Sequence, residues 1–374
     1  MEGVYNKAIK CRIYPNAVQQ IMLAKTFGCV RYVYNHFLDY KKSLYETKKE
    51  SVSCNATIKL LKDLKQSNDF LYEVDSIALQ QSLRHLDTAY KNFFTKKETG
   101  YPKFKKKMIA QSYTTVVTNN NICIANSYIK IPKIGFVKIK LHRNIPIDWK
   151  LKSITVRRSS TKKYYVSMLF EFIHNINPVS IDKDTSAIGL DFSMKKLFVS
   201  SNDLSLEYPQ FYKKTMSQLA KEQRKLSHCE RQSHNYNKQR KIVAKIHEKI
   251  RNQRLDFLHK LSREITNLYD IVCIEDLDMK VMSQSLNFGK SVLDDAWGTF
   301  TTLLQYKLEF EGKHLVKIDK WFPSSKICSK CGCIKELTLQ DRVYKCECGL
   351  TIDRDLNAAI NIKNEGLRLL LQAA

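Results

Sequence analysis

Apolar and polar residues alternate at the start of the chain and then change their spacing. The alternation in "NKAIKCRIYP" predicts a β-strand that ends at Pro15. From residue 16 to 92, apolar residues recur at three- and four-residue spacing, which predicts helices. We interpret the aromatic residues of this region as core that packs between helices rather than as a surface for base stacking: Phe27, Tyr32, Tyr34, Phe37 and Tyr40.

Period-two alternation returns between residues 111 and 175, where short segments are separated by turn residues. This pattern predicts an antiparallel sheet or a small β-barrel. After the polar segment "IHNINPVSIDKDTS" we expect three strands, a long helical stretch from about 211 to 269, a strand, a helix and another strand. Gly312 stands where the cap of that later helix is expected, and a last helix begins near Arg354. The second half of the chain is therefore predicted to be α/β.

Positive charge dominates the composition and changes the expected partners. The chain has 63 Lys and Arg against 37 Asp and Glu, a formal net charge of +26. So large an excess is repulsive in a folded protein unless a polyanion neutralises it. Nucleic acid is the favoured partner. A generally basic, soluble protein is the plainer alternative, and a membrane surface is less favoured because no long apolar segment occurs.

Basic and amide-rich segments supply candidate contacts to nucleic acid. Between residues 221 and 254, eleven Lys or Arg stand against three Glu, which favours a pair of helices lining phosphates over a solvated face. In "FFTKKETGYPKFKKK" lysines interleave with aromatic rings, so the segment is either a solvated turn or a nucleic-acid contact. The helical "IALQQSLRHL" carries two amides that either read bases in a groove or are ordinary surface residues. The candidates are Arg224, Lys225, Arg240, Lys241, Lys103, Lys105, Lys106, Gln80 and Gln81.

Five of the eleven cysteines cluster between Cys328 and Cys348. The first residues contain no apolar core long enough for a signal peptide, so a reducing, cytoplasmic location is expected. Clustered cysteines in that setting indicate a metal site rather than disulfides. Two glycine-followed knuckles predict a structural Zn²⁺ whose four thiolates leave no open position. The predicted ligands are Cys328, Cys331, Cys346 and Cys348, with Cys333 as an alternative.

Acidic residues stand at the ends of several expected elements. Asp191 ends the apolar strand "AIGLD", and Glu275 ends "IVCIE". Asp353 and Asp355 begin the last helix, where Asp353 could simply be the N-cap. A carboxylate at the end of a buried strand is costly without a positive partner, so these acids suggest bound Mg²⁺ or Mn²⁺. Two such ions can activate a water and stabilise the leaving oxygen in phosphodiester hydrolysis.

These motifs resemble a known family. The segments "GLDFS", "IVCIEDLDM" and "FPSSKICSKCG…CECGLTIDRDLNAAINI" are similar to the three RuvC motifs and the inserted zinc ribbon of the TnpB (OrfB) family. This family comprises compact transposon-encoded nucleases related to type V CRISPR effectors. Upstream, "GYPKFKKK", "GFVKIKLHR", "KYYVSMLFE" and "RLDFLHKLSREI" also resemble it, so the likeness covers nearly the whole chain. The "CEC" knuckle departs from the commoner CxxC spacing.

The resemblance implies that Asp191, Glu275 and Asp355 are the catalytic acids and the ligands of Mg²⁺ or Mn²⁺. Asp355 matches the third position, because the family motif places its acid directly before an x-Asn-(Ala/Gly) element. Asp353 would then cap or support the helix. The implied fold is multidomain α+β: a wedge-type β-barrel (1–15 and 93–180), a helical recognition insertion (16–92), an RNase H-like (RuvC) nuclease domain (181–319 and 351–374) and a zinc-ribbon insert (320–350).

Members of this family bind a guide RNA derived from the transposon end and cut double-stranded target DNA beside a short motif. In such systems base pairing reads the target sequence, while the protein reads the flanking motif and the duplex shape. The resemblance thus implies a guide-RNA-dependent DNA endonuclease, cytoplasmic and nucleoid-associated when bound to DNA. Two alternatives stay open: a transposase or recombinase that joins strands, and an RNA-guided repressor with a decayed nuclease. The presence of all three acids argues against the repressor.

Overall fold

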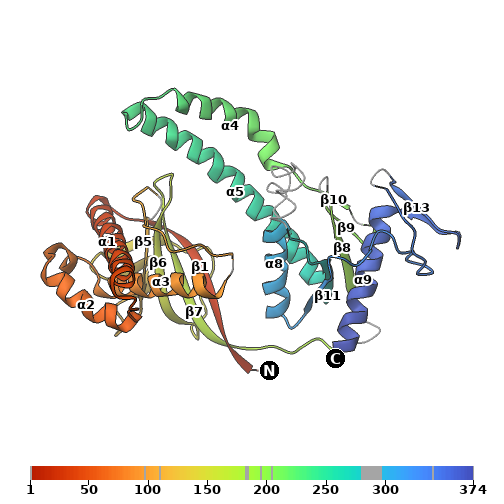
Figure 1. Cartoon of the computed structure of the whole chain (residues 1–374), viewed down its shortest axis with the longest axis horizontal. Helices are drawn as coiled ribbons and strands as arrows, with labels where there is room; N and C mark the ends of the chain where they lie inside the picture. The colour runs from red at the N-terminus through yellow and green to blue at the C-terminus, as the bar shows by residue number, and fades with distance from the viewer. Residues whose placement is uncertain are drawn as a thin grey trace. The chain divides into compact units, whose positions relative to one another are not determined.

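The computed structural model describes residues 2–96, 98–108, 111–181, 185–193, 196–203, 205–278, 297–338 and 341–373. The chain divides into two compact units, Glu2–His174 and Asn175–Ala374 (Figure 1). We describe each unit by itself. Across the described ranges, no helix is both long enough and apolar enough to span a bilayer.

The N-terminal unit combines a seven-stranded sheet with α-helices. The strand order is β2-β6-β7-β1-β5-β4-β3, so the first strand lies inside the sheet. The helices lie between β1 and β2 in sequence. The bounds are β1 (Glu2–Tyr14), α1 (Ala17–Lys48), α2 (Cys54–Gln66), a 3₁₀ helix (Asp69–Tyr72), α3 (Ser76–Thr95), β2 (Ser112–Val116), β3 (Cys123–Ala125), β4 (Tyr128–Ile131), β5 (Gly135–Lys140), β6 (Lys150–Arg158) and β7 (Tyr164–Asn175).

Local sequence explains how this unit begins. In β1 the buried side chains Ile9, Cys11 and Ile13 alternate with more exposed ones, so the predicted strand is confirmed. Asn16 then caps α1: its Oδ1 accepts the N–H of Gln19 at 2.9 Å, and its own N–H donates to Gln19 Oε1 at 3.0 Å. This reciprocal capping box stops the strand and starts the helix.

The aromatic residues of α1 divide between core and surface. Phe27, Tyr34 and Phe37 are buried, as the periodicity predicts. Tyr32 and Tyr40 are each 38% exposed, so the interpretation of all five as core is wrong for these two. The helix is amphipathic at its centre only, and it presents part of its aromatic face to solvent.

The C-terminal unit is built on a five-stranded mixed sheet with the order β10-β9-β8-β11-β12. β11 is parallel to both β8 and β12, whereas β8–β9 and β9–β10 are antiparallel. A two-stranded hairpin, β13–β14, leads into the last helix. The bounds are β8 (Ala187–Phe192), β9 (Lys196–Ser200), β10 (Ser205–Glu207), α4 (Phe211–Ser227), α5 (His234–Leu268), β11 (Ile271–Glu275), α8 (Trp297–Phe310), β12 (His314–Ile318), β13 (Val343–Lys345), β14 (Thr351–Asp353) and α9 (Arg354–Ala373).

Helices cover both faces of this sheet, which explains the uninterrupted apolar run of β11. Val272 and Ile274 join a cluster with α5 and α8. Ile271 and Cys273 join another with Ile362 of α9. Strands that are buried on both faces carry apolar residues at every position rather than at alternate ones. The long helical stretch predicted over 211–269 is a helix pair, α4 and α5, and the start of the segment "LDDAWGTF" lies outside the described residues.

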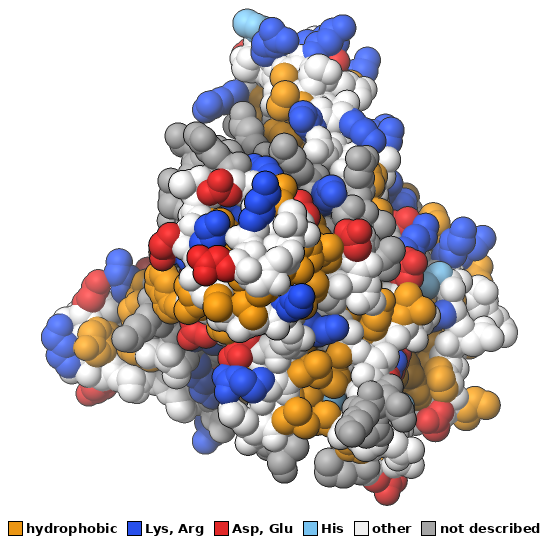
Figure 2. Space-filling view, turned by 90° about the vertical axis from the view of Figure 1, so that its right-hand side faces the viewer, with side chains coloured by type: hydrophobic (Ala, Val, Ile, Leu, Met, Phe, Trp, Pro, Cys, Tyr) orange, Lys and Arg blue, Asp and Glu red, His pale blue; other side chains and the backbone are white. Residues whose placement is uncertain are grey.

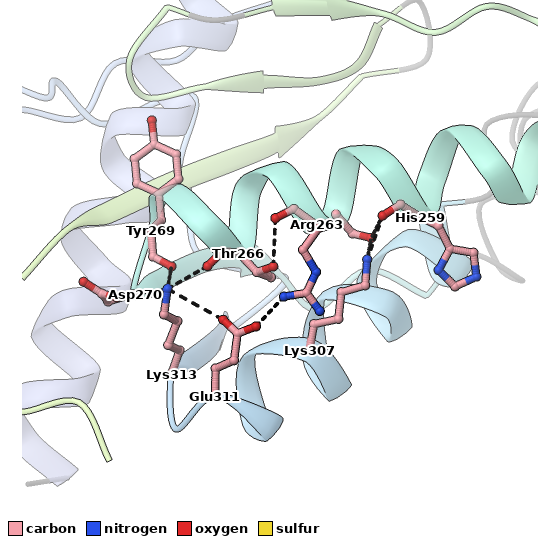
Figure 3. Close-up of polar contacts among 9 residues, drawn as sticks. His259, Arg263, Thr266, Tyr269, Asp270, Lys307, Glu311 and Lys313 are labelled. Carbon is pink, nitrogen blue, oxygen red and sulfur yellow. Dashed lines mark hydrogen bonds and ion pairs between the residues drawn. The ribbon is translucent and has the colours of Figure 1, made fainter. Parts of the chain in front are cut away.

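A polar network fixes the connections into β11 and β12 (Figure 3). Lys313 Nζ donates to the carbonyl oxygens of Thr266 at 2.6 Å and Tyr269 at 3.4 Å, where α5 ends, and it also pairs with Asp270 at 3.2 Å. A cation is favourable at a helix C-terminus. Gly312, just before it, has φ +73°, which confirms the predicted cap of α8.

Lys307 of α8 belongs to the same network and is 5% exposed. Its Nζ donates to His259 O and Ser262 Oγ, both at 2.7 Å (Figure 3). Burial lowers the pKa of Lys307 to about 8. The ammonium therefore ties α8 to α5 at a desolvation cost, which the two hydrogen bonds partly offset.

Candidate active site and metal centre

Two of the predicted acids lie at the carboxyl ends of neighbouring parallel strands. Leu190 of β8 is the register partner of Ile274 of β11. Asp191 and Glu275 directly follow these partners, so both acids lie at the carboxyl ends of two adjacent strands. The carboxyl ends of strands in open α/β sheets are where ligands commonly bind.

Close packing of α9 on the sheet brings in the third acid. A Cβ added to Gly189 of β8 would lie 2.1 Å from the carbonyl oxygen of Ala359, and one added to Gly366 would lie 2.4 Å from Cys273 Sγ. Only glycine permits so close an approach. Asp355 stands one helical turn before Ala359, which directs it toward the end of β8 where Asp191 lies.

The three carboxylates share one electrostatic environment. Burial raises the pKa of Asp191 well above its ordinary value, and the negative charges of Glu275 and Asp355 raise it further. Burial also raises the pKa of Glu275, opposed by a hydrogen bond that Ser324 Oγ donates to Glu275 Oε1 at 2.6 Å. Among the described residues these carboxylates do not form a group whose oxygens all lie within 4.8 Å of one another. The arrangement is a loose, repulsive triad that a cation would stabilise.

Asp353 and Asp355 occupy different positions at the start of α9. Asp353 is exposed, and its Oδ1 accepts the N–H groups of Asp355 at 2.9 Å and Leu356 at 3.1 Å, as a helix N-cap does. Asp355 is half-buried, and one of its oxygens lies 3.4 Å from Arg354 Nη2. Of the two, Asp355 acts more strongly on the pKa of Asp191. The choice of Asp355 as a metal ligand remains a prediction.

Four cysteine sulfur atoms lie within 4.8 Å of one another and could hold a metal ion: those of Cys328, Cys331, Cys346 and Cys348. The Cys328–Cys348 and Cys331–Cys346 sulfur distances are 3.6 Å and 3.5 Å. Cys333, the alternative ligand, is outside this group and exposed. The glycines after the knuckles, Gly332 and Gly349, have φ of +78° and +88°, which lets each knuckle turn back.

The pKa values of the four thiols differ in direction. Burial acts to raise the pKa of Cys328, but the backbone N–H groups of Cys331 and Lys330 hydrogen-bond its sulfur and lower the pKa to about 6. The pKa values of the other three thiols, those of Cys331, Cys346 and Cys348, are raised. Tyr344 of β13 is fully buried beneath the knuckles, where its hydroxyl donates toward the carbonyl oxygens of Lys326 and Cys333, both at 3.1 Å. Spacing of cysteines alone gave no reason to single out this tyrosine.

A buried asparagine pair joins the cysteine group to the helix that carries Asp355. Asn361 Nδ2 donates to Ser324 O at 2.8 Å and to Ile327 O at 2.7 Å, and Asn357 Nδ2 donates to Ile327 O at 2.7 Å. Because Ser324 also donates to Glu275, one network reaches the first knuckle, α9 and the acid of β11. Sequence analysis missed these residues, although asparagines four apart in "NAAIN" place two amides on one helix face.

The predicted nucleic-acid contacts differ in accessibility. Arg224, Lys225, Arg240 and Lys241 are all exposed on the α4–α5 pair. Many Lys and Arg side chains cover this pair at the top of the space-filling view (Figure 2). Lys103 and Lys106 are exposed, whereas Gln80 and Gln81 are half-buried on α3. Lys105 Nζ lies 3.7 Å from the centre of the Tyr34 ring, and burial lowers its pKa to about 8.

Comparisons with known proteins match most of the chain. Residues 175–286 match the OrfB_IS605 family model, described as "Probable transposase", residues 297–362 match "Cas12f1-like, TNB domain", and residues 1–50 match "Helix-turn-helix domain". In the structure those first residues form one strand and one long helix, β1 and α1.

Two relatives carry the name "Putative RNA-guided DNA endonuclease". One, from Streptomyces pristinaespiralis, is 35% identical over 96% of this chain and 89% of the relative. The other, InsQ of Escherichia coli K12, is 28% identical over 96% of this chain and 92% of its own length. A solved Cas12f1–sgRNA–target DNA complex is similar in fold, with a TM-score of 0.63, 14% identity and coverage of 96% and 99%. At that identity the structural likeness concerns the fold alone.

Proposed function

The chain belongs to the TnpB (OrfB) family, and from that premise we propose that it is a transposon-encoded, guide-RNA-dependent DNA endonuclease. The observation that carries the proposal is the convergence of three acids from separate elements, β8, β11 and α9, on the carboxyl end of one sheet. A transposase would use similar acids, and the family description "Probable transposase" keeps that second candidate in the test below.

We assign the C-terminal unit to an RNase H-like (RuvC) nuclease fold. Three antiparallel strands followed by two parallel ones, in the order β10-β9-β8-β11-β12, support this assignment. In the same proposal, residues 1–15 and 93–180 make a wedge-type barrel around the helical insertion 16–92. Residues 181–319 and 351–374 make the nuclease, with 320–350 as its zinc insert. The position of β1 inside the N-terminal sheet supports the split of the first domain.

Bound Mg²⁺ or Mn²⁺ would balance the negative charge of these acids more fully than the nearby side chains do. Three further carboxylates, those of Glu275, Asp355 and Asp353, lie close enough to Asp191 to raise its pKa, and Arg354 offsets their charge only in part. When bound there, two divalent cations would supply an activated water and charge stabilisation for the leaving oxygen.

The protein's own residues would hold and orient the reacting groups. Asp191 and Glu275 fix one side of the site from adjacent strands, and Asp355 closes it from α9. Ser324 holds one oxygen of Glu275, which sets the plane of that carboxylate. In-line attack of water on the phosphodiester would leave a 5′-phosphate and a 3′-hydroxyl, and this single centre would cut both strands in turn.

The four-cysteine group would hold a structural zinc ion. Tetrahedral Zn²⁺ with bonds of about 2.3 Å sets ligand sulfurs ~3.8 Å apart. The Cys331–Cys346 and Cys328–Cys348 sulfur distances of 3.5 Å and 3.6 Å are close to that spacing. The hydrogen bonds of Asn357 and Asn361 would then hold α9 in a fixed position relative to the first knuckle. In this way zinc would help to position Asp355, the third acid.

The basic surfaces would hold the guide RNA and the guide–target duplex. The exposed cations of α4 and α5 lie on a helix pair that projects from the sheet (Figure 1). Contacts of Lys and Arg to phosphates provide affinity without reading sequence. Double-stranded target DNA and a guide RNA from the transposon end are the proposed partners, met in the cytoplasm.

The test is purification from cells that also express the flanking transposon end, followed by sequencing of bound RNA. We expect one discrete RNA species, and Mg²⁺-dependent cleavage of DNA that pairs with it. Asp191→Ala should abolish cleavage and leave RNA binding nearly intact, whereas Asp256→Asn, an exposed aspartate on α5, should change neither. Joined strand-transfer products from transposon-end DNA without RNA would instead establish a transposase. A bound RNA with no cleavage would establish a repressor.

A further inference from the structure

The N-terminal unit contains a small open pocket on α1 that none of the proposed contacts uses. Its volume is about 420 Å³, roomy enough for a nucleobase. We call it the α1 pocket, lined by Gly28, Arg31, Tyr32, Asn35, His36, Asp39 and Phe104. All of these residues belong to the N-terminal unit.

Exposed rings line the pocket. Phe104 is 50% exposed and Tyr32 is 38% exposed. The ring of Tyr32 stacks on that of His36, with centres 6.1 Å apart and planes 25° apart. A Cβ added to Gly28 would meet no atom within 4 Å, so open space lies over the helix between these groups. Flat aromatic faces beside open space suit a flat ring as ligand.

One charged side chain of the pocket has an unused donor. Arg31 Nη1 is buried and has no hydrogen-bond partner within the part of the chain that the structure describes. A buried donor left unpaired is costly, so a ligand atom that accepts a hydrogen bond from Arg31 Nη1 would be stabilised. Asn35, by contrast, is fully engaged: it donates to Lys105 O at 3.0 Å and accepts the N–H of Lys105 at 2.8 Å. Asn35 therefore holds the segment that carries Phe104 in place.

The positive charges beside the pocket favour a ligand ring that belongs to a polyanion. Lys103 and Lys106 are exposed on either side of Phe104. Lys105 is turned away, with its ammonium over Tyr34. Asp39 supplies an exposed acceptor inside the pocket, which suits a hydroxyl or amino group better than a phosphate.

We propose that the α1 pocket binds one unpaired base of an RNA strand, with Phe104 and Tyr32 contacting the base and Arg31 donating to its acceptor atoms. This inference rests on the proposed function only in that the chain binds RNA. RNA is favoured over DNA because its loops and ends present unstacked bases without prior opening of a duplex. Asp39 can also accept from a 2′-hydroxyl, which DNA lacks.

The test measures binding of the full-length protein to a fluorescent, unstructured RNA of about six nucleotides, and to DNA of the same sequence. Phe104→Leu removes the ring but keeps an apolar side chain, and Arg31→Gln removes the donor charge. Each should weaken RNA binding by about tenfold. Neither should reduce the dependence of affinity on salt, because no phosphate contact is lost, whereas Lys103→Gln should reduce it.

Matched controls come from the same unit. Phe136→Leu changes a ring that is 54% exposed on β5, and Arg84→Gln changes an exposed arginine on α3; both should bind RNA as the wild type does. Wild-type affinity in Phe104→Leu, an equal loss in Phe136→Leu, or tighter binding of the DNA would overturn the proposal.

Ultraviolet crosslinking of the unmodified protein gives a second measurement in case Arg31→Gln fails to fold. RNA containing 4-thiouridine should crosslink to a peptide that contains Tyr32 or Phe104, and crosslinks confined to other peptides would overturn the pocket. Guided cleavage by the wild type is scored separately. Cleavage with no pocket crosslink refutes the pocket alone, whereas a pocket crosslink without guided cleavage refutes the nuclease alone.

Discussion

In the C-terminal unit, the cysteine group forms from residues close together in sequence, whereas the carboxylate triad forms from residues far apart in sequence. The four cysteines come from one short segment, and their sulfur atoms gather within 4.8 Å through two turns and a hairpin. Asp191, Glu275 and Asp355 come from β8, β11 and α9. They meet only when the parallel strands are in register and α9 packs against Gly189.

The electrostatics of the two centres differ as well. Backbone N–H groups lower the pKa of Cys328, so one of the four cysteines favours the thiolate that a metal binds, while the pKa values of the other three are raised. At the triad, burial and neighbouring charges raise the pKa of Asp191, so the acids resist being brought together. The mutually repelling carboxylates must be held together by the packing of separate elements and by a cation. The four cysteines are brought together within one segment, by its turns and hairpin.

The largest expected effect is the loss of cleavage on changing Asp191 to Asn. Transition-state stabilisation by a metal centre amounts to several kcal/mol, so cleavage should fall by about 10³-fold or more. Without divalent cations the same variant should melt at a higher temperature than the wild type, because one of three mutually repelling charges is gone. Cleavage assays and melting curves in chelator check both signs. A lower melting temperature would contradict the repulsive triad.

Zinc content gives the next largest effect. Cys328→Ser should lose most of its bound zinc and lower the melting temperature, since structural zinc contributes several kcal/mol to folding. Cys333→Ser should keep its zinc, because Cys333 lies outside the four-sulfur group. Elemental analysis of both purified variants checks this pair. Equal zinc in the two variants would rule out the ligand set.

The range of contacts also explains what the sequence could predict. The cysteine spacing and the acids at the strand ends are local signals. The fold brings the four cysteines into one group and places Asp191 and Glu275 at the carboxyl ends of adjacent strands. The roles of Ser324 and Tyr344 depend on partners elsewhere in the chain, so no local pattern indicates them, whereas for Asn361 only the spacing to Asn357 gives a local signal. Tyr32 shows the opposite limit: it stands two residues before the buried Tyr34 on α1, so helical spacing places it on another face, and it is exposed.

The asparagine network joins the two centres, and breaking it should have an intermediate effect. Asn361→Ala removes hydrogen bonds to Ser324 O and Ile327 O from a residue that is 5% exposed. Ile327 O keeps its hydrogen bond from Asn357, but Ser324 O loses its Asn361 donor, which should cost about 1–3 kcal/mol of stability. Because Ser324 orients Glu275, cleavage should also require more Mg²⁺.

Asn364→Ala is the matched control, since Asn364 is exposed on the same helix and should tolerate the change. Unfolding curves and Mg²⁺ titrations of both variants separate the two effects. A destabilised Asn361→Ala with an unchanged Mg²⁺ requirement would reduce the network to a purely structural one.

The smallest effect concerns Lys307, whose hydrogen bonds tie α8 to α5 on one face of the sheet. Its pKa is lowered from 10.5 to about 8 in the folded protein, so between these values the unfolded chain binds more protons than the folded one. Stability from this group therefore rises with pH across that window, by about 1 kcal/mol from pH 8 to 9. Lys307→Met should lose this rise, whereas Lys260→Met, on exposed surface, should keep it. Urea unfolding at both pH values measures the difference, and an identical pH slope in Lys307→Met and the wild type would contradict it. Zinc content should not change between the two Lys variants, because the predicted ligands lie within residues 328–348 and Lys307 bonds to α5 instead.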